Sequence, residues 1–281
     1  IDNSPHTLMD DFGDIFDWSN SGYTNKVKPE HILWIDFTGL PAAGLGTNNE
    51  QDFQGGHDFV PRLRDEPKDK KGRQGELKAA LAANGHEFGG YGGASPLPLL
   101  ADRSSWDDGD LRYDKTFTQE YEGIPLKFVY CKKLWNLSSE FSPRGNKNEN
   151  VVMIRLADIY LMAGEAENEL NGPDNAYQYV NKVRERAFEP DQPWSGMTQS
   201  EFRVEMQEER MHELCMENHR KPDLVRWGIY VERIRNTQFQ KHNAQAATNV
   251  QDKHRYAPIP LSEIQLNPNL LNTDPTNNGY R

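Results

Sequence analysis

Residues 151–187 read VVMIRLADIYLMAGEAENELNGPDNAYQYVNKVRERA, and this stretch predicts two helices joined by a tight turn. Apolar side chains in its first part recur at intervals of four and three residues, which places them on one face of a helix. Asn171-Gly172-Pro173 should end that helix, because glycine readily adopts left-handed backbone angles and proline lacks an N–H group. The predicted apolar face consists of Val152, Leu156, Ile159, Ala163, Ala166 and Leu170.

The second helix of this stretch shows the same periodicity. Asp174 is placed to cap it, and its apolar side chains follow at intervals of four, three and four residues. Two antiparallel helices with so short a connection form an αα-hairpin, and small residues such as Ala163 and Gly164 would let them approach closely, as in tetratricopeptide-type units. The apolar residues of the second helix are Ala176, Val180, Val183 and Ala187.

A second helical hairpin is expected to follow. Thr198 and Glu201 match a capping box, so a third helix should begin there and run to about His219. Pro222 suits the first turn of a fourth helix. Residues 150–236 are therefore predicted to form two helical hairpins, whose later apolar positions are Phe202, Met206, Met211, Leu214, Leu224, Trp227, Val231 and Ile234.

The regions on either side of these helices have a different composition. Residues 1–150 hold 17 of the 22 glycines, so we expect 1–149 to be a loop-rich region that carries the ligand surface. Short β segments are expected near residues 31–37 and 124–129. The prolines of 237–281 predict an extended tail without helix. The fold class is therefore mainly α, with tetratricopeptide-like hairpins and a large irregular region.

Charge and hydropathy exclude several classes of protein. The 281 residues carry a formal net charge of −11, which argues against a binder of nucleic acid. No apolar run reaches the roughly 18 residues that a membrane-spanning helix requires. Two cysteines, Cys131 and Cys215, are too few for a disulfide framework. The chain opens without a signal peptide or lipid-anchor motif, so in an exported protein these would lie outside it.

No motif for catalysis, metal or cofactor binding is complete. In His212-Glu213-Leu214-Cys215-Met216 the second zinc ligand of the helical metalloprotease motif is replaced by methionine. The glycines at 89–93 lack the lysine and serine or threonine of a phosphate-binding loop. Gly109 lies at the wrong offset for a calcium loop of the EF-hand type. We therefore expect no cofactor, no metal and no enzymatic activity, although a pair of carboxylates that hydrolyses glycosides remains an alternative.

Aromatic side chains in the glycine-rich half are the candidate ligand contacts. A flat ring can stack against a sugar, and nearby polar groups can bind its hydroxyls. Tyr91, among four glycines, is the first candidate. Trp106 follows, because Asp107 and Asp108 lie beside it, and the third candidates are Phe53 and His57 on the loop of Gly55 and Gly56.

Four segments of the chain resemble the SusD/RagB-like family. Residues 152–166, VMIRLADIYLMAGEA, and 181–187, NKVRERA, are similar to two helices of that family. ERMHEL at 209–214, followed by Glu217, Arg220, Asp223 and RWG at 226–228, matches a third motif. PIP at 258–260 and the later Asn267-Pro268 and Gly279-Tyr280 match its C-terminal end. The charged residues of the third motif suit ion pairs between the third and fourth helices.

This resemblance implies a function and a location. It implies a surface-exposed lipoprotein of the outer membrane of Bacteroidetes-type bacteria, which binds glycans and delivers them to a SusC-like, TonB-dependent transporter. Contact with the membrane would then be through a lipid anchor only. Family members are about twice as long, so the chain resembles their C-terminal part. Apart from the resemblance, stacked helical hairpins also suit binding of a peptide or protein partner, which remains a second alternative.

Overall fold

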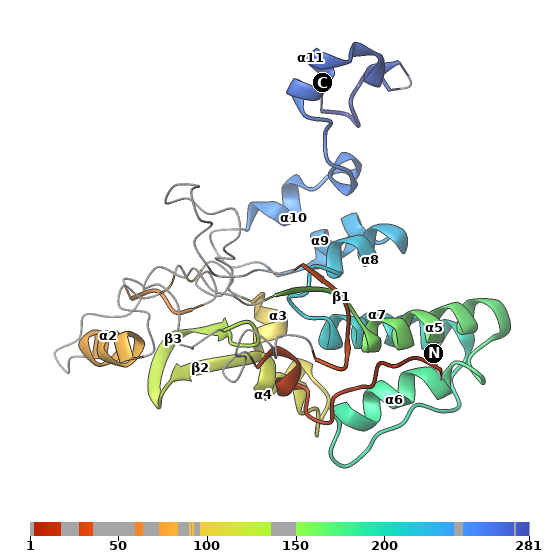
Figure 1. The fold of residues 1–281 in the computed structure, drawn as a ribbon. Helices are drawn as coiled ribbons and strands as arrows, with labels where there is room; N and C mark the ends of the chain where they lie inside the picture. Colours follow the sequence, from red (N-terminus) through yellow and green to blue (C-terminus); the bar gives the residue numbers. More distant parts are fainter. Residues whose placement is uncertain are drawn as a thin grey trace. The chain divides into compact units, whose positions relative to one another are not determined.

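The computed structural model describes residues 3–17, 28–35, 60–63, 73–83, 90, 92, 96–135, 150–238, 244–272 and 274–280. The chain divides into two compact units (Figure 1), of which the first is Ile1–Pro96 with Leu100–Glu217 and the second is Leu97–Leu99 with Asn218–Arg281. The elements up to residue 217 are η1 (Gly13–Phe16), β1 (His31–Ile35), α2 (Arg73–Ala83), α3 (Pro98–Ala101), η3 (Arg103–Ser105), α4 (Arg112–Thr116), β2 (Phe117–Tyr121), β3 (Ile124–Cys131), β4 (Val151–Arg155), α5 (Leu156–Asn171), α6 (Tyr177–Ala187) and α7 (Gln199–Glu213).

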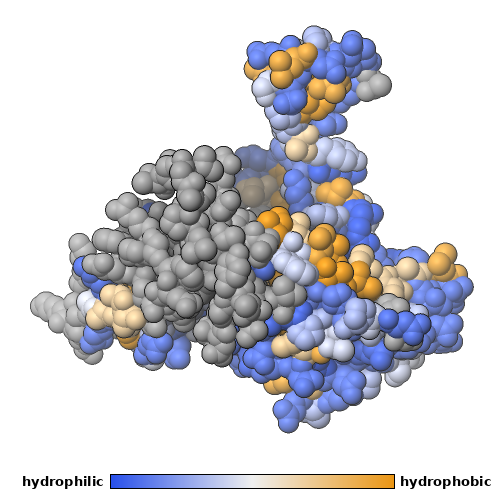
Figure 2. All heavy atoms as spheres, in the orientation of Figure 1, coloured by the Kyte–Doolittle hydropathy of each residue, from blue (hydrophilic) through white to orange (hydrophobic). Residues whose placement is uncertain are grey.

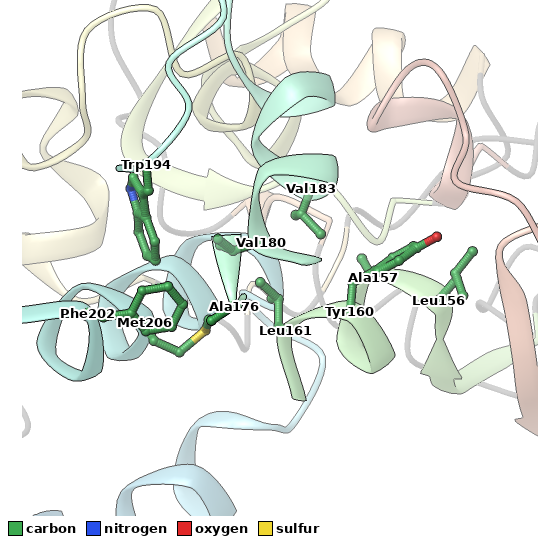
Figure 3. Close-up of a cluster of buried hydrophobic side chains, with 10 residues drawn as sticks. All are labelled: Leu156, Ala157, Tyr160, Leu161, Ala176, Val180, Val183, Trp194, Phe202 and Met206. Carbon is green, nitrogen blue, oxygen red and sulfur yellow. The ribbon is translucent and has the colours of Figure 1, made fainter. Parts of the chain in front are cut away.

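The core of the first unit lies where α5, α6 and α7 pack together (Figure 1). Their mutual packing confirms a mainly α fold with a helical hairpin, α5 and α6, joined at Gly172, which has a φ of +90°. The predicted capping box of Thr198 and Glu201 is present at the start of α7. Asp174 is not the cap of α6, because that helix has Ala176 at the cap position. The buried side chains are drawn in Figure 3 and are Leu156, Ala157, Tyr160, Leu161, Ala176, Val180, Val183, Trp194, Phe202 and Met206.

The buried face of α5 differs from the predicted one. Ala157, Leu161 and Gly164 are buried, whereas Ala166 and Leu170 of the predicted stripe are exposed. The helical spacing of the apolar residues was predicted correctly, but the buried face is rotated by about one residue from the predicted one. Both α6 and α7 pack against α5, so the direction of these two neighbours decides which residues are covered.

Two pairs of antiparallel strands complete the first unit. β1 pairs with β4, with Trp34 opposite Val152, and β2 pairs with β3 through the two-residue turn Glu122-Gly123. Both turn residues have positive φ, as a tight hairpin requires. The β segments expected near 31–37 and 124–129 are confirmed. Residues 151–155 were predicted as the start of a helix and are strand instead, because pairing with β1 outweighs the helical pattern.

The second unit contains short helices. The expected fourth helix is interrupted at Gly228, which has a φ of +76°. The tail, predicted to be extended, contains short helices that begin at or just after prolines. Among the helices of the described ranges, none is long and apolar enough to cross a membrane. The elements are α8 (Arg220–Arg226), α9 (Tyr230–Asn236), α10 (Gln245–Asn249), η5 (Asp252–Arg255), α11 (Leu261–Leu266) and η6 (Pro268–Leu271).

Gly164→Leu tests the packing of α5. A Cβ atom at Gly164 would lie 3.4 Å from Met206 Cε and 3.5 Å from the backbone oxygen of Ala176, so a methyl group fits and a larger side chain does not. We expect Gly164→Leu to lower the free energy of unfolding by about 1 to 3 kcal/mol through overpacking. The control is Ala166→Leu on the exposed face of the same helix, which should leave the urea midpoint nearly unchanged. Equal midpoints for the two variants would contradict the packing.

Candidate glycan-binding surface

The structure describes three of the six candidate ligand residues. Phe53, His57 and Tyr91 lie outside the described residues. Trp106, Asp107 and Asp108 lie on the loop that leads from η3 to α4. Their surroundings decide what each can do.

Trp106 is a core residue, and its predicted role as an exposed stacking ring is wrong. Its side chain is 3% exposed and its indole Nε1 donates to the backbone oxygen of Leu100 at 3.1 Å. The ring stacks on His212 with 4.0 Å between ring centroids and 23° between planes. Burial lowers the pKa of His212, and the neighbouring Arg112 lowers it further, so the imidazole is neutral near pH 7. No open ring face is left for a sugar.

Asp107 and Asp108 are exposed, as a hydroxyl-binding role requires. The loop that presents them is held by Arg103, whose guanidinium donates to the backbone oxygens of Trp106, Asp107 and Asp110 at 3.1 to 3.3 Å. On the other side, Gln192 Nε2 donates to the Asp108 backbone oxygen at 2.6 Å. Two exposed carboxylates therefore lie on a backbone that is fixed by side chains from within the loop and from the segment after α6.

Gly109 lets this loop lie directly against its neighbour. Its φ is +81°, and a Cβ atom there would lie 2.8 Å from the backbone oxygen of Glu189. The backbone N–H of Glu189 in turn donates to the oxygen of Gly109 at 3.1 Å. Glycine is required by both the backbone angle and the close approach.

Gly90 and Gly92, on both sides of Tyr91, pack against residues 60–62. Gly90 N–H donates to the oxygen of Pro61 at 2.8 Å, and Gly92 N–H donates to the oxygen of Val60 at 3.1 Å. A Cβ atom at Gly90 would lie 2.0 Å from the Val60 oxygen, so no other residue fits there. The sequence placed these glycines in the loop-rich region that we expected to carry the ligand surface. In the structure Gly90 and Gly92 serve close approach to the segment 60–62.

A network of buried ion pairs holds the Asp107-Asp108 loop on its buried side. Arg112 forms a bidentate ion pair with Asp110, which lies near the end of the loop. Its Nε and Nη2 donate to the two carboxylate oxygens at 3.0 and 2.8 Å. Its Nη1 also contacts Glu209 at 2.5 Å and Glu213 at 3.1 Å on α7. Arg112 is completely buried. The loop is thereby attached to α7 by charge-assisted hydrogen bonds.

The network continues to β4 and α6. Arg155, at the end of β4, donates to Glu30, Glu213 and Glu217 at 2.6 to 2.8 Å. Within the described part of the chain, this network joins five cations to five buried carboxylates, whose formal charges cancel, and Arg184 also lies 3.9 Å from the exposed carboxylate of Asp107. The cations are Arg112, Lys133, Arg155, Arg184 and Arg186, and the carboxylates are those of Glu30, Asp110, Glu209, Glu213 and Glu217.

The arginines keep the carboxylates of α7 ionised. Burial alone raises the pKa of Glu213, but Arg186, Arg155 and Arg112 outweigh it and hold that pKa far below its usual range. The pKa of Glu209 is likewise lowered by Arg112 and Arg184 against the effect of burial. These carboxylates are therefore ionised near neutral pH and carry no proton to deliver to a substrate there.

Aromatic rings of the N-terminal segment cover the network. The Lys133 Nζ lies 4.7 and 4.5 Å from the ring centroids of Phe12 and Phe16, and the Arg155 guanidinium carbon lies 5.8 Å from each. The two rings exclude water while their faces attract the cations. The sequence signal for the network was the spacing of Glu209, Glu213 and Glu217, but the prediction that these acids join the third helix to the fourth is wrong. Their partners come from α4, β4, α6 and the segment after β3.

Comparisons with known proteins agree on one family. The sequence model of the SusD family matches residues 101–280. SusD-like protein P25 of Formosa agariphila is 41% identical over 290 residues, which cover 100% of this chain and 54% of that protein. Surface glycan-binding protein A from Bacteroides thetaiotaomicron has a similar fold, with a TM-score of 0.67 and 20% identity over 96% of this chain and 56% of its own. The same protein in complex with laminarihexaose gives a TM-score of 0.66 and 18% identity, over 94% and 55% of the two chains. The chain spans about half the length of these relatives.

Glu213→Gln tests the buried network. The substitution keeps the shape of the side chain and removes a charge that three arginines share, so we expect the free energy of unfolding to fall by about 3 to 5 kcal/mol. The control is Glu169→Gln, which affects an exposed pair with Arg203 and should cost less than about 1 kcal/mol. Equal urea midpoints for the two variants would show that the network does not stabilise the fold.

Stability should fall as the solution becomes acidic. Burial lowers the pKa of His31 from 6.5 to about 4, so between these values the unfolded chain binds a proton that the folded protein does not. Below pH 4.5 the carboxylates of Glu209, Glu213 and Glu217 act in the same direction, because their pKa values are lowered in the folded state. Urea titrations at a series of pH values from 7 to 4 should show that the free energy of unfolding falls as the pH falls. In His31→Gln the free energy of unfolding should depend less steeply on pH. A wild-type slope in His31→Gln would contradict this assignment.

Proposed function

This chain belongs to the SusD family, and from that premise we propose that the protein binds glycans at the cell surface without changing them chemically. The observation that carries the proposal from this structure is the exposed pair Asp107 and Asp108 on a fixed backbone. A loop whose backbone is already held in place loses less conformational freedom when its exposed carboxylates bind hydroxyl groups. The laminarihexaose bound by a protein of similar fold supports glycans as the ligand class.

The proposal places the glycan surface in the loop-rich half. Tyr91, Phe53 and His57 would supply the stacking rings, and Asp107 and Asp108 would accept hydrogen bonds from sugar hydroxyls. Trp106 would act indirectly, because its buried ring fixes the start of the loop on His212. The backbone on both sides of Tyr91 is anchored to residues 60 and 61, which would present the ring on a firm base.

The buried acids on α7 and just after it do not supply the protonated carboxyl group of a glycoside hydrolase. A glycoside hydrolase needs one carboxyl group that carries a proton near neutral pH and a second carboxylate across the scissile bond. The buried acids Glu209, Glu213 and Glu217 have lowered pKa values and direct their oxygens to arginine and lysine. They therefore serve the fold and cannot act as a general acid.

The proposal also includes a partner and a location. Like the family that it resembles, the protein would sit in the outer membrane as a surface lipoprotein and deliver its glycan to a SusC-like, TonB-dependent transporter. Co-purification of such a transporter from the native bacterium with an antibody to this chain would test the partner. Purification of the chain without any transporter, under conditions that keep other outer-membrane complexes intact, would count against it.

Calorimetry with neutral and acidic oligosaccharides tests the glycan surface. Tyr91→Ala removes one ring and should weaken binding about tenfold, since one aromatic contact contributes on the order of 1 to 2 kcal/mol. Asp107→Asn combined with Asp108→Asn should also weaken binding, whereas Asp114→Asn, an exposed acid on α4, should not. Product formation from any of the glycans would identify an enzyme, and binding of peptides alone would identify a helical-repeat receptor. Wild-type affinity in both test variants would place the surface elsewhere.

A further inference from the structure

Arg184, on α6, is a buried arginine whose guanidinium reaches the proposed glycan loop. Its side chain is 5% exposed. The Nε atom donates to the backbone oxygen of Gln192 at 2.8 Å, and Nη1 donates to the Glu209 carboxylate at 2.7 Å. Among the described residues Nη2 makes no hydrogen bond, and its neighbour is Asp107, whose Oδ2 lies 3.9 Å away. Since an arginine carries five N–H donors, the two on Nη2 have no acceptor in this part of the chain.

Neighbouring groups fix the guanidinium in this position. Its central carbon lies 4.1 Å from the ring centroid of Phe188 and 5.0 Å from that of Trp194. Gln192 connects the arginine to the loop, because its backbone oxygen accepts from Arg184 and its side chain donates to the Asp108 backbone oxygen at 2.6 Å. A ligand would therefore meet a donor and an acceptor that are already in place, which lowers the entropy that binding costs.

The gap of 3.9 Å between Arg184 Nη2 and Asp107 Oδ2 suits one bridging oxygen. It is too long for a direct hydrogen bond, whereas an oxygen at about 2.8 Å from each atom fits between them. The bridging group must accept from the guanidinium and donate to the carboxylate. A hydroxyl does both through one oxygen, whereas an ether oxygen only accepts and an ammonium group only donates. The pair therefore selects a hydroxyl group, that of a ligand or of water.

The gap is open to solvent on the Asp107 side, and its surroundings are polar. The Asp107 side chain is 65% exposed. The exposed residues of α6 are Gln178, Lys182 and Glu185, and the surface over this helix is mostly hydrophilic in Figure 2. Partial burial, and after it the charge of Asp107, raise the pKa of Glu205 on α7, so that carboxylate lies close to the gap as well. A ligand that enters here meets polar groups from the loop, α6 and α7.

We propose that Arg184 is a further ligand-binding residue of the glycan surface and that it shares one free sugar hydroxyl with Asp107. The hydroxyl oxygen accepts from Arg184 Nη2, and its O–H group donates to Asp107 Oδ2. This inference rests on the proposed function, that the protein binds glycans on the Asp107-Asp108 loop. It adds a specificity, because a sugar that is methylated or sulfated at this oxygen would keep the first hydrogen bond and lose the second.

Titration calorimetry on the full chain tests Arg184, with laminarihexaose and a hexamer of uronic acids as the probes. Arg184→Lys keeps a positive charge beside Glu209 but cannot bind three partners in fixed directions, so the affinity should fall about tenfold. The matched control is Arg186→Lys, a buried arginine of the same helix that pairs with Glu30 and Glu213. Its affinity per folded molecule should equal that of the wild type, with the folded fraction taken from melting curves.

Double variants test whether Arg184 and Asp107 bind the same hydroxyl. Asp107→Ala combined with Arg184→Lys should weaken binding no more than the larger of the two single losses, because both changes remove one contact. Asp108→Ala combined with Arg184→Lys should multiply the two single losses, because Asp108 contacts a different hydroxyl. Losses that multiply in the first combination would overturn the shared hydroxyl.

A crystal structure of the wild-type chain with the tighter-binding probe depends on no variant. We expect a sugar oxygen within about 3.2 Å of both Arg184 Nη2 and Asp107 Oδ2. A water molecule in the gap, with the sugar bound elsewhere on the chain, would overturn this inference and leave the proposed function intact. Wild-type affinity in Arg184→Lys, or an equal loss in Arg186→Lys, would have the same meaning. Failure of the wild-type chain to bind either probe would contradict the proposed function and this inference with it.

Discussion

Charge neutralisation inside the first unit is the constraint on which the rest of the structure depends. A buried carboxylate such as Glu213 is tolerated only because three arginines, on α4, β4 and α6, reach it. If any of these elements moved, a charge would remain buried without a partner, at a cost comparable to a large part of a domain's stability. The network therefore fixes how α4, β4 and α6 lie against α7. Hydrophobic packing around Phe202 and Met206 supplies the driving force, and the ion pairs select one arrangement.

The same network holds one end of the loop that carries Asp107 and Asp108. Asp110 and Arg112 lie in its buried part, whereas Asp107, 3.9 Å from Arg184, and its neighbour Asp108 are exposed. The loop is thus attached to the buried ion pairs at Asp110 and is open to solvent at Asp107 and Asp108. Such an arrangement leaves the exposed residues free to vary while the anchor stays the same.

The glycines of the first half illustrate how two different causes give the same sequence pattern. At Gly90 and Gly109 any residue with a Cβ atom would clash with a backbone oxygen of a distant segment. From sequence, a glycine-rich stretch is interpreted as a loop or as a ligand contact. Neither interpretation reveals which distant segment of the chain packs against the glycines. Trp106 is a related case, because it lies beside two exposed acids and yet packs on His212, which is more than a hundred positions away.

The sequence by itself determined the helices α5 and α6 with the turn between them, the start of α7, and the family. Periodic apolar residues, the capping box at Thr198 and the stop at Gly172 act within a few positions of one another, so local physical chemistry was enough to predict them. Of the candidate site, the sequence identified Asp107 and Asp108 as exposed but misjudged Trp106. Only the tertiary structure decided which face of α5 is buried, which arginines neutralise Glu209 and Glu213, and which aromatic rings reach solvent. Each of these depends on groups that are far apart in the chain, and no local pattern encodes which distant side chain will be there to meet them.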